Sequence, residues 1–185
     1  MSLSKTFFAA VLVGAAAVVA MAYLPTVPRP VPPAQAVVPA KLTQSIHVRE
    51  QVPLADVPGL SVKGYRTIID LRPDGEERDQ PASAAVAQAA AGAGLRFAYV
   101  PTPRGTIPDA VVADFARALD GAEGPVLLYC RSGSRAARVW ALAEATRPGG
   151  GDAAAIAGAV KAAGQEVDDL MPRIAARIAA RTTNQ

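Results

Sequence analysis

Short apolar runs alternate with helical segments along the chain from residue 42 onward. Four segments have the composition of strands: 45–49, a possible edge strand, 65–71, 95–100 and 125–129. Five others have the apolar spacing or capping residues of helices: 54–63, 83–93 with Ser83 as its predicted N-cap, 109–119, 152–163 and 167–181. Strands that alternate with helices favour a parallel sheet. We therefore expect an α/β domain with a central parallel sheet of four or five strands and helices on both faces.

Residues 1–24 predict a signal peptide or a transmembrane anchor. The run 7–24 contains no charge and follows Lys5, which is the layout of an export signal. Two small-x-small sites, 20–22 and 34–36, offer places for cleavage. If neither is used, 18 apolar residues make roughly 27 Å of helix, an adequate membrane span.

Residues 25–41 predict a proline-rich linker. Six prolines within this segment favour extended polyproline II and block helix formation. The folded domain then comprises residues 42–185. Both interpretations of the first 24 residues place this domain in the cell envelope. It is either anchored in the inner membrane facing the periplasm or released into the periplasm.

Composition excludes several classes of function. A net charge of only +3 gives no case for nucleic-acid binding, which requires a clustered basic face. The single cysteine, Cys130, cannot form an intramolecular disulfide and is a candidate reactive thiol in an exported chain. With one histidine, His47, beside one cysteine, the chain lacks a usual zinc ligand set. We expect no metal and no cofactor.

The strongest candidate for chemistry is the segment 129–135, which reads YCRSGSR. Cys130 follows the most apolar strand, and Ser134 predicts the N-cap of a helix. That helix has apolar residues at the spacing i, i+3, i+4 and i+7, namely Ala136, Val139, Trp140 and Ala143. A strand, a tight loop and a helix N-terminus therefore meet at the cysteine.

This arrangement favours a thiolate in an anion-binding loop. Backbone N–H groups converge there, and the helix N-terminus adds partial positive charge. Gly133 allows the backbone angles that such a loop needs, and Arg131 and Arg135 are permanently charged. These features favour thiolate over thiol. A bound oxyanion would contact residues Arg131, Ser132, Gly133 and Ser134 and the guanidinium of Arg135.

Two segments resemble a known family. The first is residues 64–83, GYRTIIDLRPDGEERDQPAS, and the second is residues 125–142, PVLLYCRSGSRAARVWAL. Together with the helical tail that contains Gly164, they are similar to the phosphatase-like domain of beta-lactamase hydrolase-like proteins. That family is related to dual-specificity phosphatases. The resemblance covers roughly residues 42–170 and implies a phosphatase-like fold.

The resemblance also implies roles for particular residues. Cys130 is implied as the nucleophile and Arg135 as the anion-binding arginine. The resemblance marks a further group at the carboxyl end of a strand, where open α/β sheets bind ligands: Asp70, Arg72, Asp74 and Glu76. We count Arg72 among the expected anion-binding residues.

The loop length departs from the phosphatase pattern. Four residues separate Cys130 from Arg135, whereas tyrosine and dual-specificity phosphatases have five, and Tyr129 stands where they usually have histidine. Rhodanese-type sulfurtransferases have the shorter C-R-x-G-x-R loop. A narrower loop suits a persulfide better than a phosphoryl group. We therefore predict sulfur transfer through a Cys130 persulfide, from a small anion such as thiosulfate.

Two alternatives remain open. One is hydrolysis of a phosphomonoester through a phosphocysteine, and the other is a non-catalytic anion-binding module. Hydrolysis needs a general acid to protonate the leaving group. The candidates are Asp109, which we take as the catalytic acid, and Asp70 or Asp74. Sulfur transfer needs no such acid.

Overall fold

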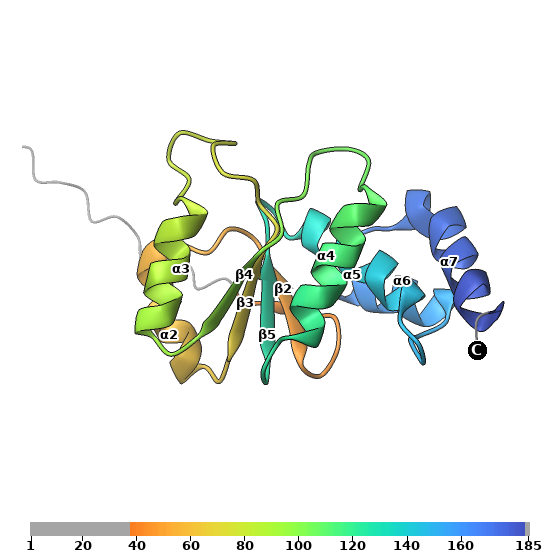
Figure 1. The fold of residues 1–185 in the computed structure, drawn as a ribbon, viewed down its shortest axis with the longest axis horizontal. Coiled ribbons are helices and arrows are strands. Elements are labelled where there is room, and N and C mark those ends of the chain that lie inside the picture. Colours follow the sequence, from red (N-terminus) through yellow and green to blue (C-terminus); the bar gives the residue numbers. More distant parts are fainter. Residues whose placement is uncertain (1–37, 184–185) are drawn as a thin grey trace, which may run out of the picture. The chain divides into compact units, whose positions relative to one another are not determined.

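A five-stranded sheet forms the centre of the protein, whose computed structural model describes residues 38–183 (Figure 1). The strands are β1 (Ala40–Lys41), β2 (Ile46–Arg49), β3 (Thr67–Asp70), β4 (Arg96–Tyr99) and β5 (Val126–Tyr129). Their spatial order is β1-β2-β5-β3-β4. The four strands from β2 to β4 are parallel, and β1 runs antiparallel to β2. The predicted α/β sheet is confirmed, with one antiparallel strand added.

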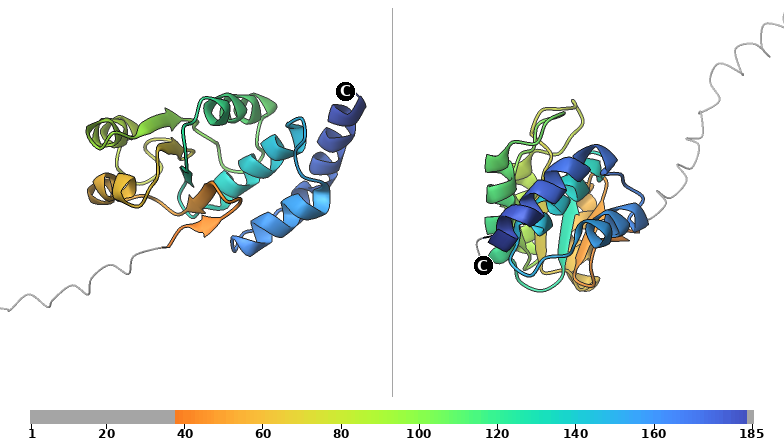
Figure 2. Two further views of the ribbon diagram at one scale, coloured as in Figure 1. Left: turned by 90° about the horizontal axis from the view of Figure 1, so that it is seen from below. Right: turned by 90° about the vertical axis from the view of Figure 1, so that its right-hand side faces the viewer.

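Helices cover both faces of this sheet. They are η1 (Leu54–Asp56), α2 (Val57–Val62), α3 (Ser83–Gly92), α4 (Asp109–Asp120), α5 (Ser134–Thr146), α6 (Ala153–Ala162), η2 (Asp168–Leu170) and α7 (Met171–Thr183). Figure 1 shows α2 and α3 on one face and α4 and α5 on the other. Helices α6 and α7 contact each other and pack on α5, outside the sheet (Figure 2).

The apolar pattern of the central strands explains these layers. Successive residues of a strand point to opposite faces. Thus Ile68 and Leu127 belong to the core under α2 and α3, whereas Ile69 and Leu128 belong to the core under α4 and α5. Every residue of β3 and β5 is buried, as expected for parallel strands covered on both sides.

The strand ends define one edge of the sheet. Arg49 pairs in register with Tyr129, Tyr129 with Asp70, and Asp70 with Tyr99, so four carboxyl ends lie level. From this edge the chain leaves β3 toward α3 on one face and leaves β5 toward α5 on the other. Ligands bind to open α/β sheets at such a switch point.

Two details at the start of the chain differ from expectation. Ala40 and Lys41, assigned above to the linker, form β1. Because β1 pairs with β2, residues 46–49 do not form an edge strand. The described residues all belong to one compact unit, so the predicted domain of residues 42–185 is extended by β1.

Two predicted helix caps are wrong. Ser83 and Ser134 are the first residues of their helices, after the N-caps Ala82 and Gly133, and neither N-cap makes a side-chain capping bond. At α3 the reason is visible. The carboxylate of Asp74 accepts hydrogen bonds from the backbone N–H and the hydroxyl of Ser83, both at 2.7 Å, and so takes the place of a cap.

The predicted signal peptide or anchor, residues 1–24, and the linker up to residue 37 lie outside the described residues. Within residues 38–183, no helix combines the length and the apolar character needed to cross a membrane.

Candidate active site

Cys130 lies between the end of β5 and the start of α5. This residue is 1% exposed, belongs to the core on the α5 side, and forms no disulfide. Gly133 ends the loop with φ of 88°, a left-handed conformation that glycine adopts without strain. A Cβ on Gly133 would meet the amide of Gln165 at 3.3 Å and the carbonyl of Arg49 at 3.4 Å. The special backbone conformation predicted for Gly133 is therefore confirmed.

Three hydrogen bonds hold this loop in place. The carbonyl of Tyr129 accepts from the backbone N–H of Leu71 at 2.9 Å, and the carbonyl of Arg131 accepts from that of Gln51 at 3.3 Å. The side-chain amide of Gln165 donates to the carbonyl of Ser132 at 3.4 Å. The segments after β2 and β3 and the segment after α6 thus brace the loop. Its position places the positive end of α5 beside Cys130.

Arg135 is fixed in a defined orientation in the first turn of α5. Its Nη1 and Nη2 atoms donate to the two carboxylate oxygens of Glu76, each at 2.7 Å, and Nη1 also donates to the carbonyl of Thr102 at 2.7 Å. Burial tends to lower the pKa of Arg135. The hydrogen bond to Glu76 and the charge of neighbouring Cys130 outweigh burial, so that pKa is raised. The predicted pair of Cys130 and Arg135 is therefore brought together.

Glu76 is the centre of an arginine cluster. Besides Arg135 it accepts from Nε of Arg72 at 3.2 Å and from Nε of Arg104 at 3.5 Å. The Glu76 side chain is 10% exposed. Its pKa is lowered to about 2, chiefly by the hydrogen bond from Arg135. Glu76 is thus a carboxylate at every physiological pH. We call these four residues the Glu76 cluster.

Two of the expected anion-binding residues, Arg72 and Arg131, differ in burial and in their partners. Arg72 is buried, and two of its donors are taken by Glu76 and by the side chain of Gln51, the latter at 2.8 Å. Arg131 is exposed, with Nη2 3.2 Å from a carboxylate oxygen of Glu77. Arg131 therefore lies at the mouth of the loop, whereas Arg72 lies behind it as part of the Glu76 cluster.

Asp70 and Asp74 are both engaged by neighbouring groups. Asp74 binds the start of α3, as described above. Asp70 is 2% exposed, and its carboxylate accepts from the backbone N–H of Arg72 at 2.8 Å. Burial raises the pKa of Asp70 to about 6, so this group holds a proton more readily than an ordinary aspartate. It lies in register with Tyr129, next to the nucleophile in sequence.

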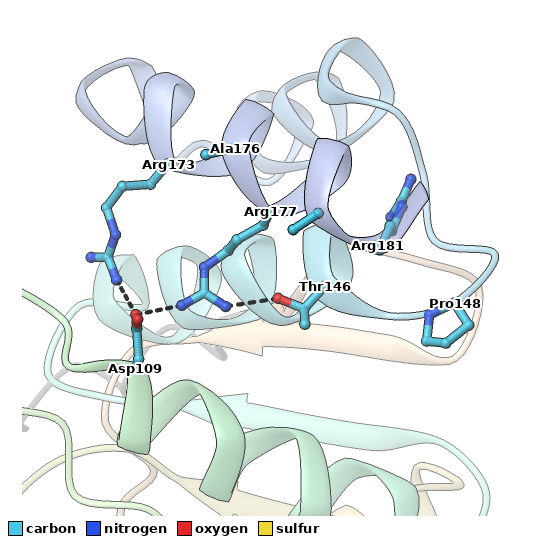
Figure 3. A pocket seen from close by; sticks show the side chains of 8 residues that line it. Asp109, Thr146, Pro148, Arg173, Ala176, Arg177 and Arg181 are labelled. Carbon is cyan, nitrogen blue, oxygen red and sulfur yellow. Dashed lines mark hydrogen bonds and ion pairs between the residues drawn. The ribbon is translucent and has the colours of Figure 1, made fainter. Parts of the chain in front are cut away.

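Asp109 points in another direction. It is the first residue of α4, after Pro108, and its side chain is 80% exposed. Its carboxylate accepts from Arg173 at 2.7 Å and from Arg177, both on α7 (Figure 3). The charge of Arg177 is the main cause of its lowered pKa. Its hydrogen bonds are to α7 and not to the Cys130 loop. Because its pKa is lowered, it holds no proton near neutral pH and is a poor proton donor.

Three residues of the site were not anticipated: Gln51, Thr102 and Gln165. The first two follow the carboxyl ends of β2 and β4, so the rule for ligand sites at strand ends would have pointed to them. Gln165 lies between α6 and α7 and carries no comparable signal in the sequence.

Comparisons with known proteins found relatives of this chain. Residues 39–147 match the family described as beta-lactamase hydrolase-like protein, phosphatase-like domain. The beta-lactamase hydrolase-like protein of Agrobacterium fabrum is 36% identical over 105 residues, which are 57% of this chain and 24% of that protein. The one from Xylella fastidiosa (strain Temecula1) is 48% identical over 82 residues, 44% of this chain and 19% of that protein. The chain thus spans a quarter or less of these curated relatives.

Solved structures show the same likeness. A candidate phosphatase from Neisseria meningitidis is 31% identical, with a TM-score of 0.65, and the match covers 75% of this chain and 96% of that one. PTPMT1 has a TM-score of 0.58 at 14% identity, covering 78% of this chain and 96% of that one, and shows the fold alone. The predicted family resemblance is confirmed.

The Glu76 cluster predicts a specific cost for Glu76→Gln. The change removes the charge that pairs with two largely buried guanidiniums, so the free energy of unfolding should fall by about 2–4 kcal/mol. Glu77→Gln is the matched control, since Glu77 is exposed and its arginine pairs are on the surface, and it should cost less than about 1 kcal/mol. Denaturant unfolding of the full chain measures both. Equal stabilities of the two variants would contradict the cluster's importance.

The pH dependence of this effect has a defined sign. Glu76 has a pKa of about 2 in the folded chain, below its ordinary value of 4.5, so its contribution is present above that ordinary value. The contribution is lost as the pH falls toward 2. The stability difference between the native chain and Glu76→Gln should therefore be constant near neutrality and shrink in acid.

Proposed function

The chain belongs to the phosphatase-like domain family of beta-lactamase hydrolase-like proteins, and from this we propose that it is a cysteine-thiolate enzyme that acts on a small oxyanion. Cys130 is the nucleophile in this proposal. The observation that carries it is the placement of Cys130 between the end of β5 and the N-terminus of α5, beside the fixed guanidinium of Arg135. Thiolate chemistry at a helix N-terminus with a neighbouring arginine is the pattern of an activated cysteine.

Arg135 and the loop form the oxyanion site. A guanidinium has five N–H donors, and within the described residues Glu76 and Thr102 take three hydrogen bonds from Arg135. Two donors remain for Cys130 or for a bound oxyanion. Because Glu76 fixes the guanidinium in advance, no reorientation is needed when the substrate binds.

We propose sulfur transfer as the reaction. The Cys130 thiolate attacks the outer sulfur of thiosulfate or a similar donor, the S–S bond of the donor breaks, and sulfite leaves with the bonding electron pair. A persulfide remains on Cys130. A nucleophilic acceptor such as cyanide or a thiolate then takes the terminal sulfur, and the Cys130 thiolate is restored. No step requires a proton from the protein.

Two observations support this choice over phosphate hydrolysis. The loop holds four residues between Cys130 and Arg135, the length found in rhodanese-type enzymes. Two of the acidic groups considered as proton donors are also engaged elsewhere, since Asp74 binds Ser83 and Asp109 binds α7. The third, Asp70, is buried and accepts a hydrogen bond from the backbone N–H of Arg72.

Phosphomonoester hydrolysis is the second candidate, and the comparisons favour it. The family is described as phosphatase-like. Among the structural neighbours, TpbA has been crystallised with pTyr and PTPMT1 with PI(5)P. Those ligands belong to proteins less than 25% identical to this chain. If the chain hydrolyses phosphoesters, Asp70 is the acid best suited to donate a proton, because its pKa of about 6 keeps part of it protonated near neutrality.

The two reactions predict different rates in the full chain. Thiocyanate formation from thiosulfate and cyanide should exceed hydrolysis of an aryl phosphate. Cys130→Ser should abolish thiocyanate formation. Asp109→Asn is the control, and its rate of thiocyanate formation should stay within about twofold of the native rate because that carboxylate faces α7. Fast aryl phosphate hydrolysis without thiocyanate would favour the second candidate, and Asp70→Asn should then slow it. A chain with neither activity would be a non-catalytic anion-binding module.

We further propose that the domain works in the cell envelope. The support is the uncharged run 7–24 after Lys5, which lies outside the described residues, and the proline-rich segment behind it. Protease added to spheroplasts should digest the domain, or the domain should already have been released on removal of the outer layers. A domain that stays protected until the inner membrane is broken would contradict this location.

A further inference from the structure

A second group of arginines lies in a groove between α7 and the ends of α4 and α5 (Figure 3). The groove has a volume of about 650 Å³. Arg173, Arg177 and Arg181 line it from α7, and Asp109 and Thr146 line it from the opposite side. Helix α7 lies beyond residues 39–147, the part of the chain that matches the family. The function proposed for Cys130 does not involve this groove.

The three arginines follow one face of α7 at a spacing of four residues. Arg181 has a structural role, because it donates to the carbonyls of Glu144 at 3.0 Å and of Gly150 and Gly151 at 2.8 Å each, close to the end of α5. Ile174 is fully buried and attaches α7 to the core. Arg173 and Arg177 are therefore the two arginines available to a ligand.

Arg173 and Arg177 converge on a single oxygen atom. Nη2 of each donates to Oδ1 of Asp109, and Nη1 of Arg177 is held by the hydroxyl of Thr146 at 2.7 Å. Two guanidiniums directed at one point are suited to a tetrahedral oxyanion, which accepts several charge-assisted bonds at once. The acceptor now at that point is a carboxylate that is 80% exposed and can turn into solvent. A bound oxyanion could therefore displace the Asp109 carboxylate from the two guanidiniums.

Charge and shape define the ligand class. Three arginines and one aspartate line the groove, which leaves an excess of two positive charges. A phosphate group as a dianion balances that excess. Ala176, Ala180 and Pro148 provide an apolar wall beside the arginines. We propose that this groove binds a phosphate group attached to an apolar group, with Arg173 and Arg177 as its ligands and Asp109 as an internal competitor.

Phenylphosphonate is a suitable probe, because its P–C bond replaces the ester that Cys130 chemistry would cleave. Titration of the full chain, followed by NMR of the arginine Nε–H resonances, separates this groove from Arg135. Arg173 and Arg177 should shift together along one saturable curve. Arg177→Gln should weaken binding about tenfold or more. Arg117→Gln, an exposed arginine of α4 that pairs with Asp114, should leave the affinity unchanged.

The direction in which Asp109→Asn changes the affinity for phenylphosphonate is the most direct test of the proposal. If Asp109 competes with the ligand, removing its charge should tighten binding several-fold, whereas an ion pair that only docks α7 predicts no gain. Arg173→Gln is a second test should Arg177→Gln fail to fold, and it should weaken binding likewise. An affinity unchanged or lowered in Asp109→Asn would overturn the proposal.

The phosphate group could belong to a small molecule or to a lipid. Vesicles of phosphatidylcholine with and without phosphatidic acid, whose phosphomonoester headgroup can be a dianion, distinguish these sources. If the ligand is a lipid headgroup, phosphatidic acid should increase binding of the full chain, and Arg177→Gln should remove that increase. A response to phenylphosphonate alone identifies a soluble ligand. No response of the groove to either ligand would overturn the proposal, whatever reaction Cys130 performs.

Discussion

The bidentate ion pair between Glu76 and Arg135 is the interaction on which the site depends. It joins the segment after β3 to the first turn of α5, across 59 positions of sequence. Because both side chains are largely buried, neither can lose its partner without a large cost. Arg72, from the same segment as Glu76, and Arg104, from the segment after β4, attach to the same carboxylate. The fold thereby fixes the guanidinium beside Cys130 before any substrate binds.

The sheet explains why such an interaction forms here. β3 and β5 are neighbours whose chains leave toward opposite faces, so the segments that follow them meet at one edge. Cys130 comes with β5, and Glu76 comes with the segment after β3. The short loop that Gly133 ends then turns the chain into α5. The result combines a phosphatase-like fold with a loop of rhodanese length, and the reaction depends on which of the two governs the chemistry.

Features that depend on neighbouring residues could be predicted from the sequence, whereas features that depend on distant ones could not. The strands at 65–71 and 125–129 and the turn at Gly133 follow from local apolar runs and a glycine. The partners of Asp109 lie 64 and 68 positions away on α7, and no local pattern indicates them. The same holds for Gln165. β1 has only two residues and exists through its pairing with β2.

The central claim is that Cys130 carries an additional sulfur atom, as a persulfide, during turnover. Mass spectrometry of the intact chain tests this claim most directly. The chain would be treated with thiosulfate and, separately, with an aryl phosphate, and Cys130→Ser would serve as control. The account predicts a gain of roughly 32 Da, one sulfur atom, with thiosulfate only, located on Cys130 and absent from the control. A phosphoryl adduct on Cys130 from the aryl phosphate, with no persulfide from thiosulfate, would contradict it.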